Sequence, residues 1–145
     1  MKLPQDVERC KPSGTKIMIL VAYMVLVLMT SLIPMDRDIE GLNFIIQLKP
    51  AIQNLLHIPM FAVLAILSLQ VIDGFIVSGL WKFFIAAFSV VAFGIFNELV
   101  QLWVPGRYAG LLDMGLNVLG GLLGILIYVL SARSRTNLVR RLVCG

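Results

Sequence analysis

Four long apolar runs constrain the fold of this chain more than any other feature of its sequence. They cover residues 17–33, 55–72, 83–104 and 111–130, each close to the roughly 20 residues that cross a bilayer as a helix. The chain is 59% hydrophobic and 14% charged, with a mean hydropathy of +0.95, which excludes an ordinary soluble domain. We therefore predict an all-α membrane protein, a bundle of four transmembrane helices with no separate soluble domain.

The segments around these runs complete the predicted organisation. We expect a cytoplasmic tail at 1–16, a membrane domain at 17–130 and a basic cytoplasmic tail at 131–145. The first run follows a basic head, as in a signal peptide, but it is long and no small-residue cleavage site follows it, so we predict an uncleaved helix. The connection 35–54 contains an apolar piece too short to span, which favours an interfacial or re-entrant segment in the first outer loop; a disordered loop is the alternative.

The distribution of Lys and Arg predicts the orientation. Nine of these residues lie in the two tails and the 73–82 connection, and three lie in the other two connections. Because cytoplasmic segments carry the excess of positive charge, both termini are predicted to be cytoplasmic. Cys10 and Cys144 would then be reduced thiols in the cytoplasm.

Two stripes of small and polar residues flank the turn near Arg107. The first stripe is Gly94, Glu98 and Gln101, and the second is Asp113, Asn117, Gly120, Gly121 and Gly124. Each has the spacing of one helix face. If the two helices fold back antiparallel about Arg107, Gln101 lies opposite Asp113, Glu98 opposite Asn117, and Gly94 opposite Gly120 and Gly121. This register predicts a glycine-packed helix pair with a polar pocket at its turn end.

The predicted topology brings the only histidine to the same end. The candidate pocket is His57, Glu98, Gln101, Arg107, Asp113 and Asn117, with His57 and Glu98 as a candidate acid–base pair. Each residue also has a structural explanation. Glu98 and Arg107 would form a clamp, Asp113 would cap the fourth helix, Asn117 would hydrogen-bond between helices, and His57 would bond at the interface. Asn97 and Gln101 are expected to be local partners of Glu98.

Other classes of site lack a signal in the sequence. There is no paired-histidine or paired-cysteine metal motif, no glycine-rich phosphate loop and no nucleophile elbow around a serine. We therefore expect no metal, no cofactor and no nucleic-acid partner. The oligomeric state does not follow from the sequence.

The polar pattern resembles the signature of VanZ-like membrane proteins. Segment 97–101 (NELVQ) is similar to the family's E-x-x-Q motif, and segment 105–107 (PGR) to its P-x-R motif. Segment 113–124 is similar to D-x-x-x-N-x-x-G-x-x-x-G, and His57-Ile58-Pro59 to the second-helix motif. The resemblance covers residues 55–124. It departs from the family where many members carry Asp-Lys before the histidine, because Gln53 and Asn54 stand there.

The resemblance implies a bacterial inner-membrane protein of the cell envelope, linked to teicoplanin-type glycopeptide resistance. It implies no settled reaction. Together with the residues, it favours a pocket in the outer leaflet that binds a membrane lipid, a lipid-linked envelope precursor or a lipoglycopeptide. The alternatives are a membrane-embedded enzyme that acts on a lipid-linked precursor through His57 with Glu98 or Asp113, and a small partner subunit with a structural polar seam.

Overall fold

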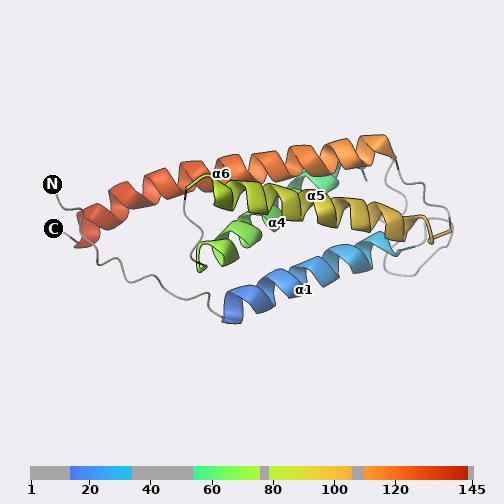
Figure 1. Cartoon of the computed structure of the whole chain (residues 1–145), viewed down its shortest axis with the longest axis horizontal. Helices are drawn as coiled ribbons and strands as arrows, with labels where there is room; N and C mark the ends of the chain where they lie inside the picture. Colours follow the sequence, from blue (N-terminus) through green and yellow to red (C-terminus); the bar gives the residue numbers. More distant parts are fainter. Residues whose placement is uncertain (1–13, 34–53, 76–78, 106–109, 144–145) are drawn as a thin grey trace.

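The computed structural model describes residues 14–33, 54–75, 79–105 and 110–143, with side chains up to residue 131. Within these segments the chain is helical and contains no strand. The helices are α1 (Gly14–Ser31), α4 (His57–Ile72), α5 (Trp81–Gln101) and α6 (Leu111–Val143) (Figure 1). The predicted interfacial segment in the first loop lies outside the described residues.

Three of these helices are long and apolar enough to cross a membrane: α1, α5 and the part of α6 over Leu111–Ser131. Helix α4 is apolar but has only 16 residues, fewer than the roughly 20 needed to cross the hydrocarbon core upright. The described part of the chain is therefore all-helical, with the long apolar helices that are typical of a membrane protein. The count of four spans stays a prediction.

Two helix boundaries differ from the predicted runs. Helix α6 continues past residue 130 to Val143, so the residues predicted as a separate tail extend the last helix. No Gly or Pro interrupts residues 131–143, and the whole helix is about 50 Å long, which exceeds the bilayer core. Helix α5 ends at Gln101 instead of 104, where the amide groups of Trp103 and Val104 turn back to the carbonyl groups of Val100 and Gln101.

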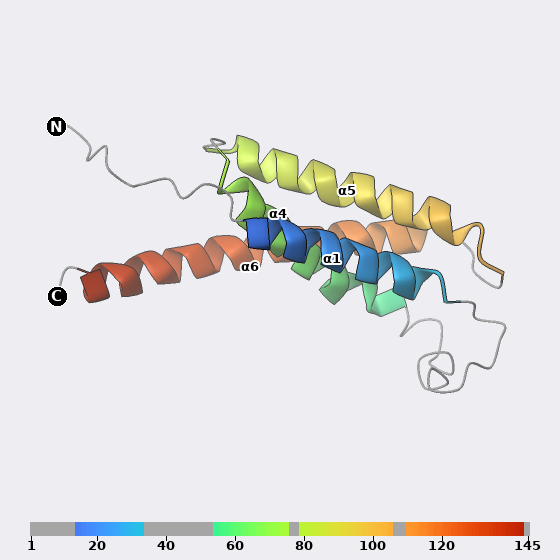
Figure 2. The same ribbon diagram turned by 90° about the horizontal axis from the view of Figure 1, so that it is seen from below.

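Helix α4 lies at the centre of the bundle. It packs on each of the other three helices and most extensively on α6. Figures 1 and 2 show it crossing obliquely between α1 and α6, with α5 alongside. Tyr23 of α1 donates a hydrogen bond to the carbonyl oxygen of Met60 at 3.0 Å, which ties α1 to the first turns of α4.

The glycines of α6 explain the close contact between α4 and α6. A Cβ atom at Gly120 would meet the backbone oxygen of Ile58, and its Cα at 3.0 Å; at Gly124 it would meet the oxygen of Ala62, and its Cα at 2.8 Å. Small residues let two backbones approach this closely. The predicted contact of Gly94 with Gly120 and Gly121 is therefore wrong. Gly120 and Gly124 face α4, and Gly121 faces Val90 of α5.

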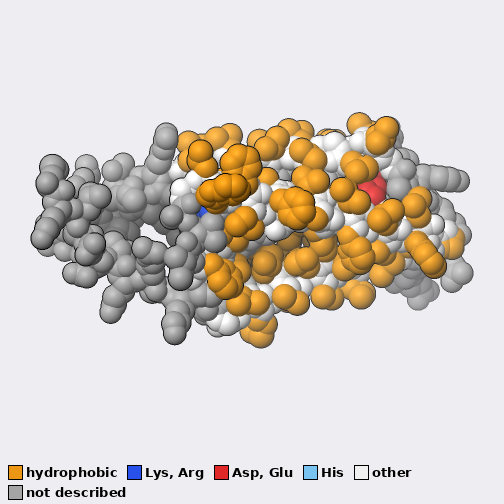
Figure 3. Space-filling view, viewed as in Figure 1, with side chains coloured by type: hydrophobic (Ala, Val, Ile, Leu, Met, Phe, Trp, Pro, Cys, Tyr) orange, Lys and Arg blue, Asp and Glu red, His pale blue; other side chains and the backbone are white. Residues whose placement is uncertain are grey.

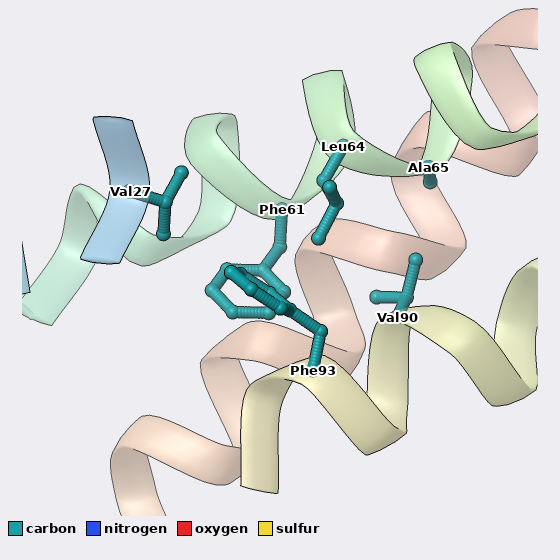
Figure 4. Close-up of a cluster of buried hydrophobic side chains, with 6 residues drawn as sticks. All are labelled: Val27, Phe61, Leu64, Ala65, Val90 and Phe93. Atoms are coloured by element: carbon teal, nitrogen blue, oxygen red, sulfur yellow. The ribbon is translucent and has the colours of Figure 1, made fainter. Parts of the chain in front are cut away.

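A small apolar core fills the space where α1, α4 and α5 meet. It consists of Val27, Phe61, Leu64, Ala65, Val90 and Phe93, whose side chains converge in Figure 4. The rings of Phe61 and Phe93 lie 6.1 Å apart at its centre. The outer surface of the helices is also apolar (Figure 3), as in a bundle surrounded by lipid.

Candidate functional site at the polar end

The buried amide and carboxyl side chains of the described residues gather at one end of the bundle. We call the first turns of α4, the last turns of α5 and the first turns of α6 the polar end. Five residues there expose between 0% and 8% of their surface: Asn97, Glu98, Gln101, Asp113 and Asn117. The helical period places the α5 members on its inward side, and the antiparallel path of α6 returns Asp113 and Asn117 beside them.

A hydrogen-bonded chain joins the three helices of the polar end. The Nδ1 atom of His57 lies 2.7 Å from Oδ1 of Asn117, and Nδ2 of Asn117 donates to Oε1 of Glu98 at 3.4 Å. The first bond is short and the second is long for a nitrogen–oxygen pair. Asn117 therefore connects the imidazole of α4 to the carboxyl group of α5, and the structure has the Glu98–Asn117 contact that the sequence register predicted.

The orientation of Asn117 fixes the proton on His57. With its amide nitrogen turned towards Glu98, Asn117 offers only an oxygen to the ring, and that oxygen can only accept. Nδ1 of His57 must then carry the hydrogen and donate it. In the neutral ring, Nε2 keeps its lone pair, so this nitrogen can accept a proton or a hydrogen bond from a ligand.

The hydrogen-bonded chain rests on the aromatic core. The ring of Phe61 stacks on His57 with 6.2 Å between their centres, and it also lies 6.1 Å from the ring of Phe93. Gly94 provides the space for this arrangement, because a Cβ there would lie 3.3 Å from Phe61 and 3.4 Å from Nδ2 of Asn117. The positions of His57 and Asn117 are thus set by packing as well as by their hydrogen bond.

Asp113 lies in the first turn of α6, where the helix dipole favours a carboxylate. Its carboxylate extends back over Gly110, since Oδ2 lies 3.3 Å from the position of a Cβ there. Asp113 is thus the third residue of α6 and is buried at the same end of the bundle as Glu98.

Several buried polar atoms at the polar end have no hydrogen-bond partner among the described residues. They are both amide atoms of Asn97, Oε2 of Glu98, Nε2 of Gln101 and Oδ1 of Asp113. The expectation that Asn97 hydrogen-bonds to Glu98 is therefore wrong, because Asn97 lies on the side of α5 that carries Phe93 and its side chain is fully buried. A buried polar group without a partner costs about 1–3 kcal/mol.

The structure thus brings together five of the six predicted pocket residues. Arg107, the sixth, lies outside the described residues. Sequence reasoning did not give Phe61 a place in the site, although its position one turn after His57 puts both on the same face of α4. Within the described segments, no three His, Cys, Asp or Glu residues are grouped so that they could hold a metal ion.

The opposite end of the bundle, which we call the basic end, has a different polar cluster. Asp73 at the end of α4 accepts hydrogen bonds from Tyr128 of α6 and from Lys82 of α5, the latter at 2.9 Å. Burial alone would raise the pKa of Asp73, but these two hydrogen bonds and the charges of Lys82 and Lys16 together lower it. Lys82 also lies over the rings of Phe83 and Tyr128.

Comparison with known proteins identifies the family. The sequence matches the VanZ/LLP1 family over residues 2–132, nearly the whole chain. Searches of curated proteins and of solved structures gave no match. The match includes all four described helices up to residue 132 and every residue of the polar end. The chain belongs to the VanZ/LLP1 family.

Proposed function

We propose that the polar end is a binding site in the outer leaflet for a lipid-like envelope component or a lipoglycopeptide. The observation that carries this proposal is the burial of polar atoms without partners among apolar helices. Polar groups at membrane depth are costly and mark functional sites. A bound headgroup would supply the missing hydrogen bonds, and the apolar helix surfaces would accept its acyl chain.

The orientation is part of the proposal. The excess of Lys and Arg in the tails and in the 73–82 connection supports a cytoplasmic basic end and an external polar end. His57, Glu98, Gln101, Asp113 and Asn117 would then face the outside of the inner membrane. Arg107, in the predicted outer turn, would meet a phosphate or carboxylate of the ligand.

Membership of the VanZ/LLP1 family supports a link between this site and glycopeptide resistance. Binding at the polar end would keep a lipoglycopeptide from its cell-wall target or change how a lipid-linked precursor is handled. The test is teicoplanin susceptibility of a Gram-positive host that expresses the protein. Glu98→Gln and His57→Gln should each lower tolerance, at equal protein levels in the membrane fraction.

The matched control is Asp73→Asn, which makes the same carboxylate-to-amide change at the basic end. It should keep tolerance unchanged. Full tolerance in both polar-end variants, or equal loss in all three variants, would refute a specific role for the polar end. Reporter enzymes fused after Arg141 test the orientation. A reporter that works only in the cytoplasm should be active there, and a reporter that works only outside the membrane should be inactive.

A second candidate function is supported by the hydrogen bond from His57 to Asn117. It holds the ring so that Nε2 is the basic nitrogen, which is the arrangement of a general base oriented by a neighbouring amide. On this proposal the protein is an enzyme that acts on a lipid-linked envelope precursor, with Glu98 or Asp113 as the acid. Purified protein should convert a labelled precursor, and His57→Gln should abolish conversion. A binding protein would show no conversion, and the same variant would only weaken binding.

A further inference from the structure

We propose that the headgroup bound at the polar end presents a primary ammonium group to Glu98 and Asp113. This inference rests on the binding site proposed above and specifies the chemistry of its ligand. It follows from two properties of the described residues: which hydrogen-bonding atoms lack a partner, and where the positive charges lie.

The atoms without partners include more oxygens than nitrogens. The oxygens are Oε2 of Glu98, Oδ1 of Asp113 and Oδ1 of Asn97, while the nitrogens are Nδ2 of Asn97 and Nε2 of Gln101. An amide oxygen and an ionised carboxylate oxygen can only accept. A ligand suited to this set must therefore bring hydrogen-bond donors. A phosphate, sulfate or carboxylate brings acceptors and would leave all three oxygens unpaired.

The charges of the described residues point to the same ligand. All the Lys and Arg residues in the described segments belong to the N-terminal turn of α1, the start of α5 or the part of α6 beyond residue 131. None of them is at the polar end, where the titratable groups among the described residues are Glu98, Asp113 and His57; Arg107 lies outside the described residues. Two buried carboxyl groups at the same end of the bundle, each with an oxygen that lacks a partner, favour a cationic group of the ligand in a medium of low dielectric constant.

A primary ammonium group satisfies both requirements. It carries one positive charge and three N–H donors, as the side chain of lysine does. A quaternary ammonium has the charge without the donors, and an N-acetylated amine has one donor without the charge. The amide nitrogens of Asn97 and Gln101 would bind hydroxyl or ester oxygens next to the amine. Two sources present such a group at a membrane surface: an aminolipid, and a lipoglycopeptide with a free amine.

The two tryptophans allow binding to be measured at the proposed site. Trp103 lies two residues after α5, beside the polar end, and is 89% exposed, while Trp81 lies at the start of α5 near the basic end. In a Trp81→Phe protein in detergent, saturable quenching of Trp103 by brominated lipid would report binding beside the polar end. The probes are phosphatidylethanolamine, its N-acetyl derivative, phosphatidylcholine and phosphatidylglycerol, all with the same brominated chains.

We expect phosphatidylethanolamine to bind about tenfold more tightly than phosphatidylcholine or the N-acetyl lipid, because hydrogen bonds between charged groups are stronger than those between neutral groups. Glu98→Gln and Asp113→Asn should each bring the ratio of these affinities closer to one. Asp73→Asn, the matched control at the basic end, should leave it unchanged. In the same protein, an amine-bearing lipoglycopeptide and its N-acetylated form compete with the lipid, and the stronger competitor identifies the source of the amine.

The outcomes separate this inference from the function on which it rests. Saturable binding in which phosphatidylglycerol equals or exceeds phosphatidylethanolamine would overturn the ammonium proposal and keep the binding site. A preference for the amine that survives both Glu98→Gln and Asp113→Asn would overturn it as well. If no lipid and no lipoglycopeptide changes Trp103 fluorescence saturably, the proposed binding site itself is wrong.

Discussion

The two ends of the bundle use acidic residues in opposite ways. At the basic end, Asp73 is partly exposed and is paired with both Lys82 and Tyr128. At the polar end, Glu98 and Asp113 are buried, and each has an oxygen without a partner among the described residues. The partly exposed acidic group at the basic end therefore has hydrogen-bond partners within the protein. The buried acidic groups at the polar end each keep an oxygen without one among the described residues.

This difference shows how a structural cluster can be distinguished from a binding site. An exposed ion pair contributes little to stability, even when its geometry is good. Buried polar groups without partners lower stability, so a fold that only needed to pack would replace them with apolar side chains. Their presence at the polar end supports the binding site proposed above, and the following predictions test the comparison between the two ends.

The largest effect is expected from Gly124→Ala, because both ends depend on the contact between α4 and α6. The added Cβ would collide with the backbone of Ala62, which cannot move as a flexible side chain can. We expect a loss of about 3 kcal/mol in unfolding free energy, measured by denaturant titration in detergent. Gly115→Ala is the matched control on the same helix, since nothing lies within 4 Å of a Cβ there. Equal losses in the two variants would contradict the observed packing.

The next prediction compares two buried asparagines at the polar end. Asn97→Leu should raise the unfolding free energy by about 2 kcal/mol, because it removes an amide that has no partner and keeps the branching of the side chain. Asn117→Leu should lower it by about the same amount, because that amide bonds both His57 and Glu98. Thermal unfolding of both variants without ligand provides the measurement. A lower unfolding free energy in Asn97→Leu would contradict this prediction and show that the side-chain amide of Asn97 has a hydrogen-bond partner.

The smallest effect is expected at the basic end. Asp73→Asn should cost about 0.5 kcal/mol at neutral pH, since the pair is partly exposed. The folded-state pKa of Asp73 is lowered, so the stabilisation is present above its unfolded pKa and is lost as the pH falls through the folded value. The difference between wild type and variant should therefore shrink below about pH 4. A difference that grows on acidification would contradict the assigned hydrogen bonds.

The sequence by itself determined the helices and much of the polar end. Long apolar runs leave the backbone no partners except its own carbonyl groups, so helices follow from the membrane environment. The period of 3.6 residues places Glu98 and Gln101 on one face of α5, and Asp113 and Asn117 on one face of α6. A short turn between the two helices was enough to predict the contact of Glu98 with Asn117, which the structure has.

Only the tertiary structure decided which neighbour each face meets. The spacing of Gly120 and Gly124 defines a face of α6 on which another backbone can approach closely, but that face fits any helix. In the folded molecule it packs on α4, because α4 crosses the centre of the bundle. The same crossing brings His57 to Asn117, with Phe61 stacked on the ring of His57. Helical periodicity fixes which residues share a face, and the packing of all four helices fixes what that face contacts.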